Sequence, residues 1–206
     1  MKVCIALTKG RLEKQFLEYL QSLSFDTTPL LNKGRKLSVD TENFRFIFAK
    51  GVDVATYVER GIADLGIVGE DILLEYSPDV YNLLPLPFGR CHFAIADRKG
   101  QRISNSKMII ATKYPNIATS FFREKGESVE IVKLEGSVEL APIIGLADAI
   151  VDIVETGTTL RENGLMIKED MFTITARCIA NRSSLKIKRN FLTPIIDVLS
   201  EKEKVI

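Results

Sequence analysis

The chain has 206 residues, 46% of them hydrophobic and 27% charged, which fits one large domain or two small ones of a well-packed soluble protein. Its 28 Lys and Arg residues balance its 27 Asp and Glu residues, so no basic field exists to attract nucleic acid, and we expect no nucleic-acid partner. Three widely spaced cysteines, no signal peptide and no apolar run near the ~20 residues of a membrane span predict a cytoplasmic protein with no membrane partner.

The first third of the chain alternates short β-branched runs with amphipathic stretches. The pattern predicts strands at 2–8, 44–50 and 63–69, and helices at 9–23, 53–61 and 70–76. In the second of these helices we expect Asp53 to be the N-cap and Gly61 to mark the end.

Pro85, Pro87 and Gly89 then interrupt an apolar run, which indicates a linker or a crossing between domains. After this break the alternation resumes, with strands predicted at 107–112, 129–134, 147–154 and 171–180, and helices at 114–126, 136–146 and 189–204. Pro194 is expected near the first turn of the last helix, where proline is tolerated.

Strand–helix alternation over the whole length predicts an α/β fold with largely parallel sheets. Breaks near residues 88 and 176 suggest a middle domain inserted into a first one. We therefore expect a discontinuous domain I (1–88 plus 177–206) and a domain II (89–176), with the ligand cleft between them.

The segment DIVETGTTLRENG, residues 152–164, is typical of an anion-binding turn after a strand. Gly157 frees the backbone to turn its N–H groups toward one oxyanion, and Thr156, Thr158 and Thr159 add hydroxyl donors. A helix start follows, whose dipole favours phosphate, with Gly164 as its stop. The sequence matches neither the nucleoside-triphosphatase P-loop nor the dinucleotide fingerprint. An ordinary capped turn is the alternative.

Two carboxylates, Asp152 and Glu155, flank this turn. They would repel a phosphate, but carboxylates accept hydrogen bonds from sugar hydroxyls. The phosphate turn and the acids together predict a ribose-phosphate ligand.

Three other turns follow predicted strands, where open α/β sheets bind ligands. Lys9, Gly10 and Arg11 come after the first strand, and these two cations could neutralise a polyphosphate. Lys50 and Asp53 flank the second turn, and Gly69, Glu70 and Asp71 form the third. For residues 9–11 the alternative is a solvated helix N-terminus. For the other two turns it is an ordinary turn without a ligand. His92 has no Cys or Asp at metal-ligand spacing, so we expect a structural or surface histidine.

Together these stretches resemble the ATP phosphoribosyltransferase family. The matching segments are LTKGRL, YVERGIADLGIVGED, FGRC, ATKYPNIATSFF, LEGSVELAPIIGLADAIVDIVETGTTLRENGL and IANR, in the family's order. The resemblance implies a two-domain fold like that of type II periplasmic binding proteins, with an active site in the interdomain cleft. It also implies a pentosyltransferase that condenses ATP with 5-phosphoribosyl-1-pyrophosphate to N1-(5-phosphoribosyl)-ATP and pyrophosphate, with substrate-bound Mg²⁺, in the first step of histidine biosynthesis.

The resemblance also implies roles for individual residues. The segment ETGTT, residues 155–159, would hold the 5-phosphate, and Asp152 would lie by the ribose. The residues that bind 5-phosphoribosyl-1-pyrophosphate would be Asp152, Glu155, Thr156, Gly157, Thr158, Thr159 and Leu160. Residues 9–11 (Lys9, Gly10 and Arg11), Lys50 and Asp71 would lie on the ATP and pyrophosphate side. Lys9 and Arg11 would offset charge on the leaving pyrophosphate, and Asp152 would favour a positive ribose ring. No general base and no protein metal ligand is implied.

One departure from the family is Lys50–Gly51, where an Arg-Pro turn is expected. Lysine keeps the charge but lacks the forked geometry of arginine, which puts in doubt how Lys50 engages a nucleotide.

The chain ends at Ile206, like the short form of the family, which lacks the C-terminal histidine-binding domain of longer members. Short forms work with a separate regulatory subunit resembling histidyl-tRNA synthetase. We therefore expect a hetero-oligomer that contains catalytic dimers. The alternative is a non-catalytic cytoplasmic sensor of ribose phosphate with the same fold.

Overall fold

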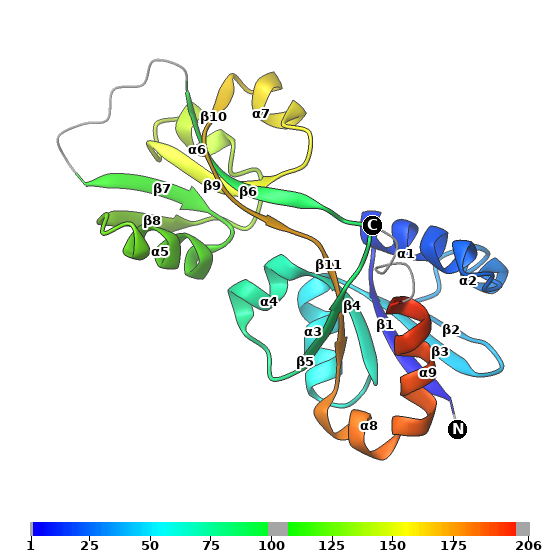
Figure 1. The fold of residues 1–206 in the computed structure, drawn as a ribbon. Helices are drawn as coiled ribbons and strands as arrows, with labels where there is room; N and C mark the ends of the chain where they lie inside the picture. Colours follow the sequence, from blue (N-terminus) through cyan, green and yellow to red (C-terminus); the bar gives the residue numbers. More distant parts are fainter. Residues whose placement is uncertain (1, 99–106, 201–206) are drawn as a thin grey trace. The chain divides into compact units, whose positions relative to one another are not determined.

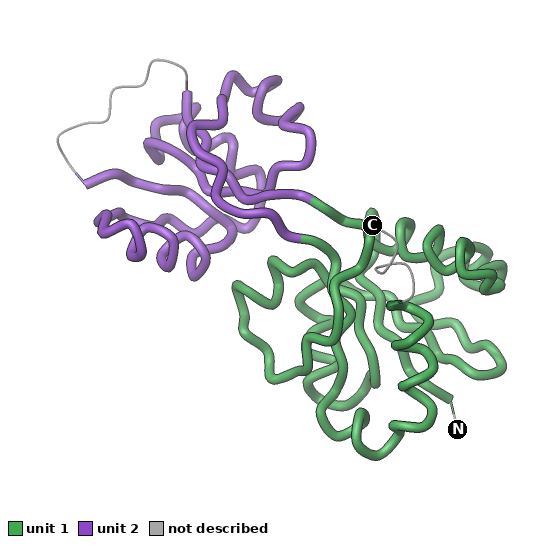
Figure 2. The backbone as a smooth tube through the Cα atoms, viewed as in Figure 1, with its two compact units in different colours: residues 1–90, 175–206 green, residues 91–174 purple. Residues whose placement is uncertain are grey.

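The computed structural model describes residues 2–98 and 107–200 and divides into two compact units. Unit 1 comprises Met1–Arg90 and Thr175–Ile206, and unit 2 comprises Cys91–Ile174 (Figure 2). The chain thus passes from one unit to the other twice. The sequence prediction placed these boundaries after residue 88 and before residue 177.

Unit 1 is built on a six-stranded mixed sheet in the order β2-β3-β1-β4-β11-β5 (Figure 1). Its strands are β1 (Val3–Thr8), β2 (Ser38–Asp40), β3 (Phe44–Ala49), β4 (Leu65–Gly69), β5 (Tyr81–Pro85) and β11 (Ala176–Ala180). Strand β1 runs parallel to β3 and β4, and the other pairs are antiparallel. The three parallel strands therefore end at the same edge of the sheet.

Helices cover both faces of this sheet. They are α1 (Arg11–Ser22), α2 (Thr28–Leu31), α3 (Gly51–Glu59), α4 (Glu70–Tyr76), α8 (Arg182–Ile187) and α9 (Arg189–Ser200). Because side chains alternate along a strand, Ile5 and Leu7 pack with α1 and α9, whereas Ala6 packs with α3. Helix α1 has the expected apolar stripe, with Phe16 and Leu20 buried.

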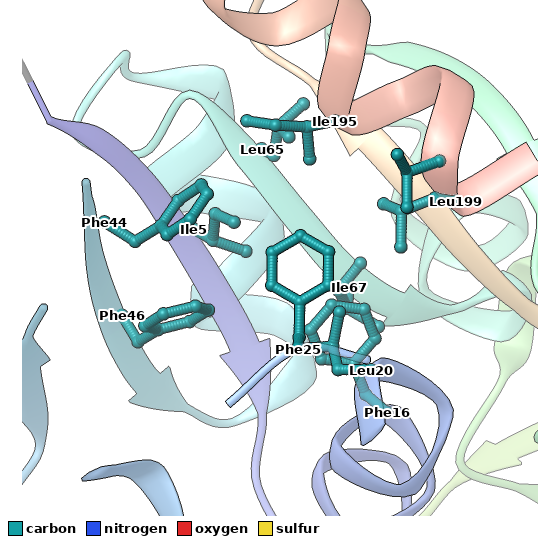
Figure 3. Close-up of a pocket in the computed structure, with 11 residues that line it drawn as sticks. Ile5, Phe16, Leu20, Phe25, Phe44, Phe46, Leu65, Ile67, Ile195 and Leu199 are labelled. Carbon is teal, nitrogen blue, oxygen red and sulfur yellow. The ribbon is translucent and has the colours of Figure 1, made fainter. Parts of the chain in front are cut away.

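A small apolar hollow of about 20 Å³ lies in the core of unit 1, between the sheet and helices α1 and α9. Figure 3 shows the side chains that surround it, among them Phe16, Phe25 and Leu199. All its lining residues are apolar, so it suits no phosphate or sugar, and it belongs to the core.

Unit 2 contains a five-stranded mixed sheet in the order β10-β6-β9-β7-β8. Its strands are β6 (Cys91–Arg98), β7 (Met108–Thr112), β8 (Val129–Lys133), β9 (Ala149–Val154) and β10 (Leu165–Ile174). Its helices are α5 (Pro115–Glu124), α6 (Leu140–Ile143) and α7 (Thr158–Glu162). Strand β7 runs parallel to β8 and β9, whereas β6 is antiparallel to β9 and β10.

The α/β class and most predicted elements are confirmed, but the expectation of largely parallel sheets was wrong. Both sheets are mixed because the segments that join the units, β6 and β10–β11, run antiparallel to their neighbours, and in unit 1 β2 is also antiparallel to β3. The strand predicted at 171–180 is in fact two strands, β10 and β11, in different sheets. Thr175 separates them, and its hydroxyl donates to the carbonyl oxygens of Leu86 (3.0 Å) and Phe88 (2.7 Å).

Four local predictions also differ from the structure. Helix α3 begins earlier than expected, so its N-cap is Lys50 and Asp53 lies in its first turn. Pro194 lies inside α9 rather than at its start, and the helix expected at 136–146 is only Leu140–Ile143. Strand β5 was not expected, because its prolines suggested a linker. Residues 201–204 of the last predicted helix lie outside the described residues.

No helix among residues 2–98 and 107–200 is long and apolar enough to cross a membrane. Cys4, Cys91 and Cys178 form no disulfide.

Candidate active site

The candidate phosphate turn of unit 2 follows the carboxyl end of β9, beside the ends of the parallel strands β7 and β8. Gly157 has φ 68° and ψ 10°, a left-handed conformation that costs a residue with a side chain. A Cβ atom there would also lie 3.2 Å from Nη1 of Arg161. The backbone conformation therefore favours glycine at this position, and a side chain would also push Arg161 aside.

Hydroxyl groups and one guanidinium group bond to one another across this turn. The Oγ1 atoms of Thr156 and Thr158 are 3.0 Å apart. Arg161 donates from Nη1 to the carbonyl oxygen of Thr156 (2.9 Å) and from Nη2 to Oγ1 of Thr158 (3.0 Å). The threonine side chains are exposed, whereas Leu160 is buried and anchors α7 against the sheet.

Helix α7 is short, as the expected stop at Gly164 implies. It has five residues, and Gly164, with φ 71°, follows it closely. So short a helix has a weak dipole, so the backbone and hydroxyl groups of the turn are the main donors available to an anion.

A hollow of about 590 Å³ opens beside the turn within unit 2. Thr156, Gly157 and Arg161 line it, together with His92 and residues at the start of β10. Nε2 of His92 lies 3.0 Å from Oδ1 of Asp170, so this histidine has a carboxylate neighbour.

Asp152 lies on β9 opposite Ala94, on the same face of the strand as Ile150 and Val154. Burial, helped by the charge of Glu139, raises the pKa of its carboxyl to about 6. A hydrogen bond from the backbone of Ile153 and the charge of Lys113 act in the opposite direction. At neutral pH the group is therefore an ionised acceptor, poorly hydrated and suited to a sugar hydroxyl or a nearby positive charge.

The sequence analysis did not predict a role for three residues of this site, Lys113, Glu139 and Arg161. Lys113 directly follows β7, a position that could have identified it. Glu139 adjoins the short helix α6, and the fold rather than any motif brings its charge near Asp152. Arg161 reads in the sequence as an ordinary helical residue.

Unit 1 gathers the other predicted residues at the carboxyl ends of β1, β3 and β4. Lys9 and Gly10 form the turn after β1, where the N–H of Lys9 donates to the carbonyl oxygen of Ala49 (2.9 Å). Gly10 has φ 91°, and Arg11 begins α1. Lys9 and Arg11 are both exposed.

Lys50 and Asp71 belong to the neighbouring turns at this edge. Lys50 is the exposed N-cap of α3, and Gly51 occupies its first position, where proline would also fit. Asp71 folds back over Gly69, where a Cβ atom would lie only 2.0 Å from its Oδ1. The structure thus brings Lys9, Gly10, Arg11, Lys50 and Asp71 to one edge of unit 1, and Asp152 and residues 155–160 to one edge of unit 2.

Comparison with known proteins identifies the relatives of the chain. The model of the HisG family, described as ATP phosphoribosyltransferase, matches residues 50–201. Proteins named ATP phosphoribosyltransferase from Bacillus cereus (strain AH187) and Bacillus anthracis are each 52% identical over 200 residues, covering 96% of this chain and 95% of theirs.

Two solved structures share the fold. One is the ATP phosphoribosyl transferase (HisG:HisZ) complex from Thermotoga maritima, with a TM-score of 0.82, 34% identity and 97% of each chain covered. The other is the periplasmic aliphatic sulphonate binding protein SsuA from Escherichia coli, with a TM-score of 0.67, 14% identity and coverage of 97% of this chain and 72% of that one. The second likeness concerns the fold alone, and it identifies a two-domain fold of the periplasmic-binding-protein type. The extent and identity of the family match show that the chain belongs to the ATP phosphoribosyltransferase family, the pentosyltransferases of the first step of histidine biosynthesis.

Proposed function

We propose that this chain transfers the 5-phosphoribosyl group of 5-phosphoribosyl-1-pyrophosphate to N1 of ATP and releases pyrophosphate, with residues 156–159 of unit 2 holding the 5-phosphate. The observation that carries this assignment is the glycine-centred hydroxyl turn that follows directly from the strand bearing Asp152. A phosphate acceptor site and a sugar-accepting carboxylate on adjacent residues match the two ends of a ribose 5-phosphate.

Asp152 would contact the ribose rather than any phosphate. Displacement at the anomeric carbon passes through a transition state with positive charge on the ring, since the bond to pyrophosphate breaks as N1 attacks. A half-buried, ionised carboxylate stabilises that charge more than it stabilises the neutral sugar. N1 of adenine already carries a lone pair, so no general base is required.

The cations of unit 1 suit the polyphosphate groups. Lys9, Arg11 and Lys50 lie at one edge of the sheet, where they would offset the negative charge of ATP and of the departing pyrophosphate. Lys50 would act as a single point charge, without the two-pronged contact that arginine makes. Asp71 would contribute to this side of the site from the first turn of α4.

Magnesium would reach the site on its substrate. Among residues 2–98 and 107–200 no three or more His, Cys, Asp and Glu side chains gather closely enough to hold a metal ion. Mg²⁺ is commonly held by substrate phosphates and one or two carboxylates, so we propose that it enters with the substrate. When bound, the ion would neutralise charge on the pyrophosphate.

We also propose a regulatory partner. The Thermotoga maritima relative was solved as a HisG:HisZ complex. By analogy, this chain would form a hetero-oligomer of catalytic dimers with a subunit resembling histidyl-tRNA synthetase. A cytoplasmic location and the absence of nucleic-acid and membrane partners stay predictions.

Mixing the chain, the partner subunit, ATP, Mg²⁺ and 5-phosphoribosyl-1-pyrophosphate tests the proposal. We expect stoichiometric release of pyrophosphate and formation of phosphoribosyl-ATP, measured by a coupled pyrophosphate assay and mass spectrometry. Binding of 5-phosphoribosyl-1-pyrophosphate without any release of pyrophosphate would instead favour the non-catalytic sensor, for which no present finding argues.

A further inference from the structure

Arg161 makes a two-pronged contact with the phosphate turn that the proposed reaction does not by itself require. Its guanidinium reaches back from the last turn of α7 to the carbonyl oxygen of Thr156 and to Oγ1 of Thr158. The two acceptors come from residues on either side of Gly157. The planar, forked guanidinium group of Arg161 thus bridges the residues before and after Gly157.

We infer that Arg161 is a positioning residue that sets the phosphate turn in its binding conformation before the substrate arrives. The inference rests on the proposed function of the turn and deepens it. Arg161 acts through the groups it holds and is not assigned a contact with the phosphate.

The bond to the carbonyl oxygen of Thr156 fixes one peptide plane. In a trans peptide the C=O and the following N–H point in opposite directions. Holding the carbonyl of Thr156 against Arg161 therefore directs the N–H of Gly157 away from the guanidinium. The same bond keeps a carbonyl oxygen, which would repel an anion, turned toward a positive charge.

The second bond defines the role of a hydroxyl group. Oγ1 of Thr158 accepts from Nη2 of Arg161, so its own hydrogen remains to be donated. That hydrogen can be shared with Oγ1 of Thr156, 3.0 Å away, or passed to a bound phosphate oxygen. Arg161 thus converts Thr158 from an uncommitted hydroxyl into a donor.

The left-handed backbone at Gly157 explains why such a brace is useful. Glycine has more backbone freedom than any other residue type, and this freedom at Gly157 must be lost when the anion binds. Bonds that restrict the pivot in the free protein reduce that cost, so they increase affinity without touching the ligand.

Titration calorimetry on the full chain tests the inference, with ribose 5-phosphate, 5-phosphoribosyl-1-pyrophosphate and inorganic pyrophosphate as probes. For Arg161→Met we expect the Kd of the two probes that carry a 5-phosphate to rise about tenfold, because two hydrogen bonds that order the turn are lost. The Kd of pyrophosphate should stay unchanged. Arg123→Met, in the last turn of α5, is the matched control and should leave all three values unchanged.

Arg161→Lys separates positioning from charge. An ammonium group keeps the charge but cannot bridge the two acceptors in the guanidinium geometry, so we expect Arg161→Lys to bind as weakly as Arg161→Met. Recovery of wild-type affinity in Arg161→Lys would overturn the positioning role. In turnover assays Arg161→Met should raise the KM for 5-phosphoribosyl-1-pyrophosphate and leave kcat and the KM for ATP unchanged, a split that a general folding defect would not produce.

The inference and the function on which it rests fail in different ways. If Arg161→Met binds ribose 5-phosphate as tightly as the wild type does, the inference is wrong and the turn assignment stands. If the wild type itself binds no ribose 5-phosphate, the turn assignment is wrong.

Discussion

Asp152 is a half-buried carboxyl group whose ionisation carries a cost for the folded chain. Its pKa rises from 3.8 to about 6, chiefly because burial disfavours the charged form. Between these two pH values the folded chain binds more protons than the unfolded chain, so the free energy of unfolding falls as the pH rises. Above pH 6 the full cost is present, and the proposed chemistry requires the ionised form.

Asp152→Asn should therefore make the chain more stable and less active. At neutral pH we expect the free energy of unfolding to increase by roughly 1–3 kcal/mol, since the amide cannot ionise. Turnover should fall by roughly 100-fold, because the charge opposite the ribose ring is lost. Urea unfolding and steady-state kinetics measure the two effects.

The pH dependence provides the control for this variant. The gain in stability should shrink as the pH is lowered from 7 toward 4, where the wild-type carboxyl group also becomes neutral. A gain that is the same at both pH values would contradict the assigned cause, and unchanged turnover would contradict the site assignment.

Gly157→Val should abolish tight binding of 5-phosphoribosyl-1-pyrophosphate. The valine would have to adopt a left-handed conformation and would displace Arg161, so we expect the Kd to rise on the order of 100-fold. Gly126→Val is a matched control, because Gly126 has φ 72°, open space around it and a position after α5, away from the turn. It should destabilise the chain by a similar amount yet bind the substrate normally, and equal loss of binding in both variants would rule out a specific role for the turn.

At the scale of elements, a buried network fastens helix α8 to the sheet of unit 1. Asp64 accepts from the N–H of Cys4 (2.9 Å), the hydroxyl of Ser184 (2.6 Å) and Nζ of Lys188 (2.9 Å). Asp64 is only 2% exposed. Without its carboxylate, these three donors would lose their acceptor. Asn181 caps the same helix through its side chain, which accepts from the N–H groups of Ser183 and Ser184.

Asp64→Ala should lower the free energy of unfolding by about 3–5 kcal/mol, because it leaves the half-buried ammonium group of Lys188 and two other donors without their acceptor. Asp79→Ala is the comparison. It removes a carboxylate whose Oδ1 lies 3.1 Å from Nε of Arg182, the first residue of α8. That pair is exposed, so its loss should cost less than about 1 kcal/mol. Chemical denaturation of both variants gives the comparison, and similar losses would show that the buried network is unimportant.

Local patterns determined most elements, and tertiary pairing determined the rest. Hydrophobic periodicity and turn residues were enough to predict β1, α1 and α4, because the burial of these elements follows directly from the spacing of their side chains. Division of residues 171–180 between two sheets was not predictable, since alternation continues across Thr175 and only the strand partners differ. The phosphate turn and Asp152 were visible as a motif, whereas the bracing contact of Arg161 depends on how α7 folds back.

At the scale of the whole molecule, regulation is expected to depend on the partner subunit. We expect the isolated chain to be weakly active or inactive, and to ignore histidine when measured alone. Adding the regulatory subunit should increase turnover and make it sensitive to histidine. Strong inhibition of the isolated chain by histidine, seen in a pyrophosphate-release assay, would contradict this arrangement.

The position of β11 in its sheet bears on the order in which the two units fold during translation. This strand lies between β4 and β5, although all of residues 91–174 separate it from β5 in the chain. On the ribosome, β5 has no neighbour in its sheet until β11 has emerged, by which time every strand of unit 2 has been synthesised. The sheet of unit 2 can thus be completed during translation before the sheet of unit 1, which still lacks β11. We therefore expect the domain that starts the chain to finish folding last.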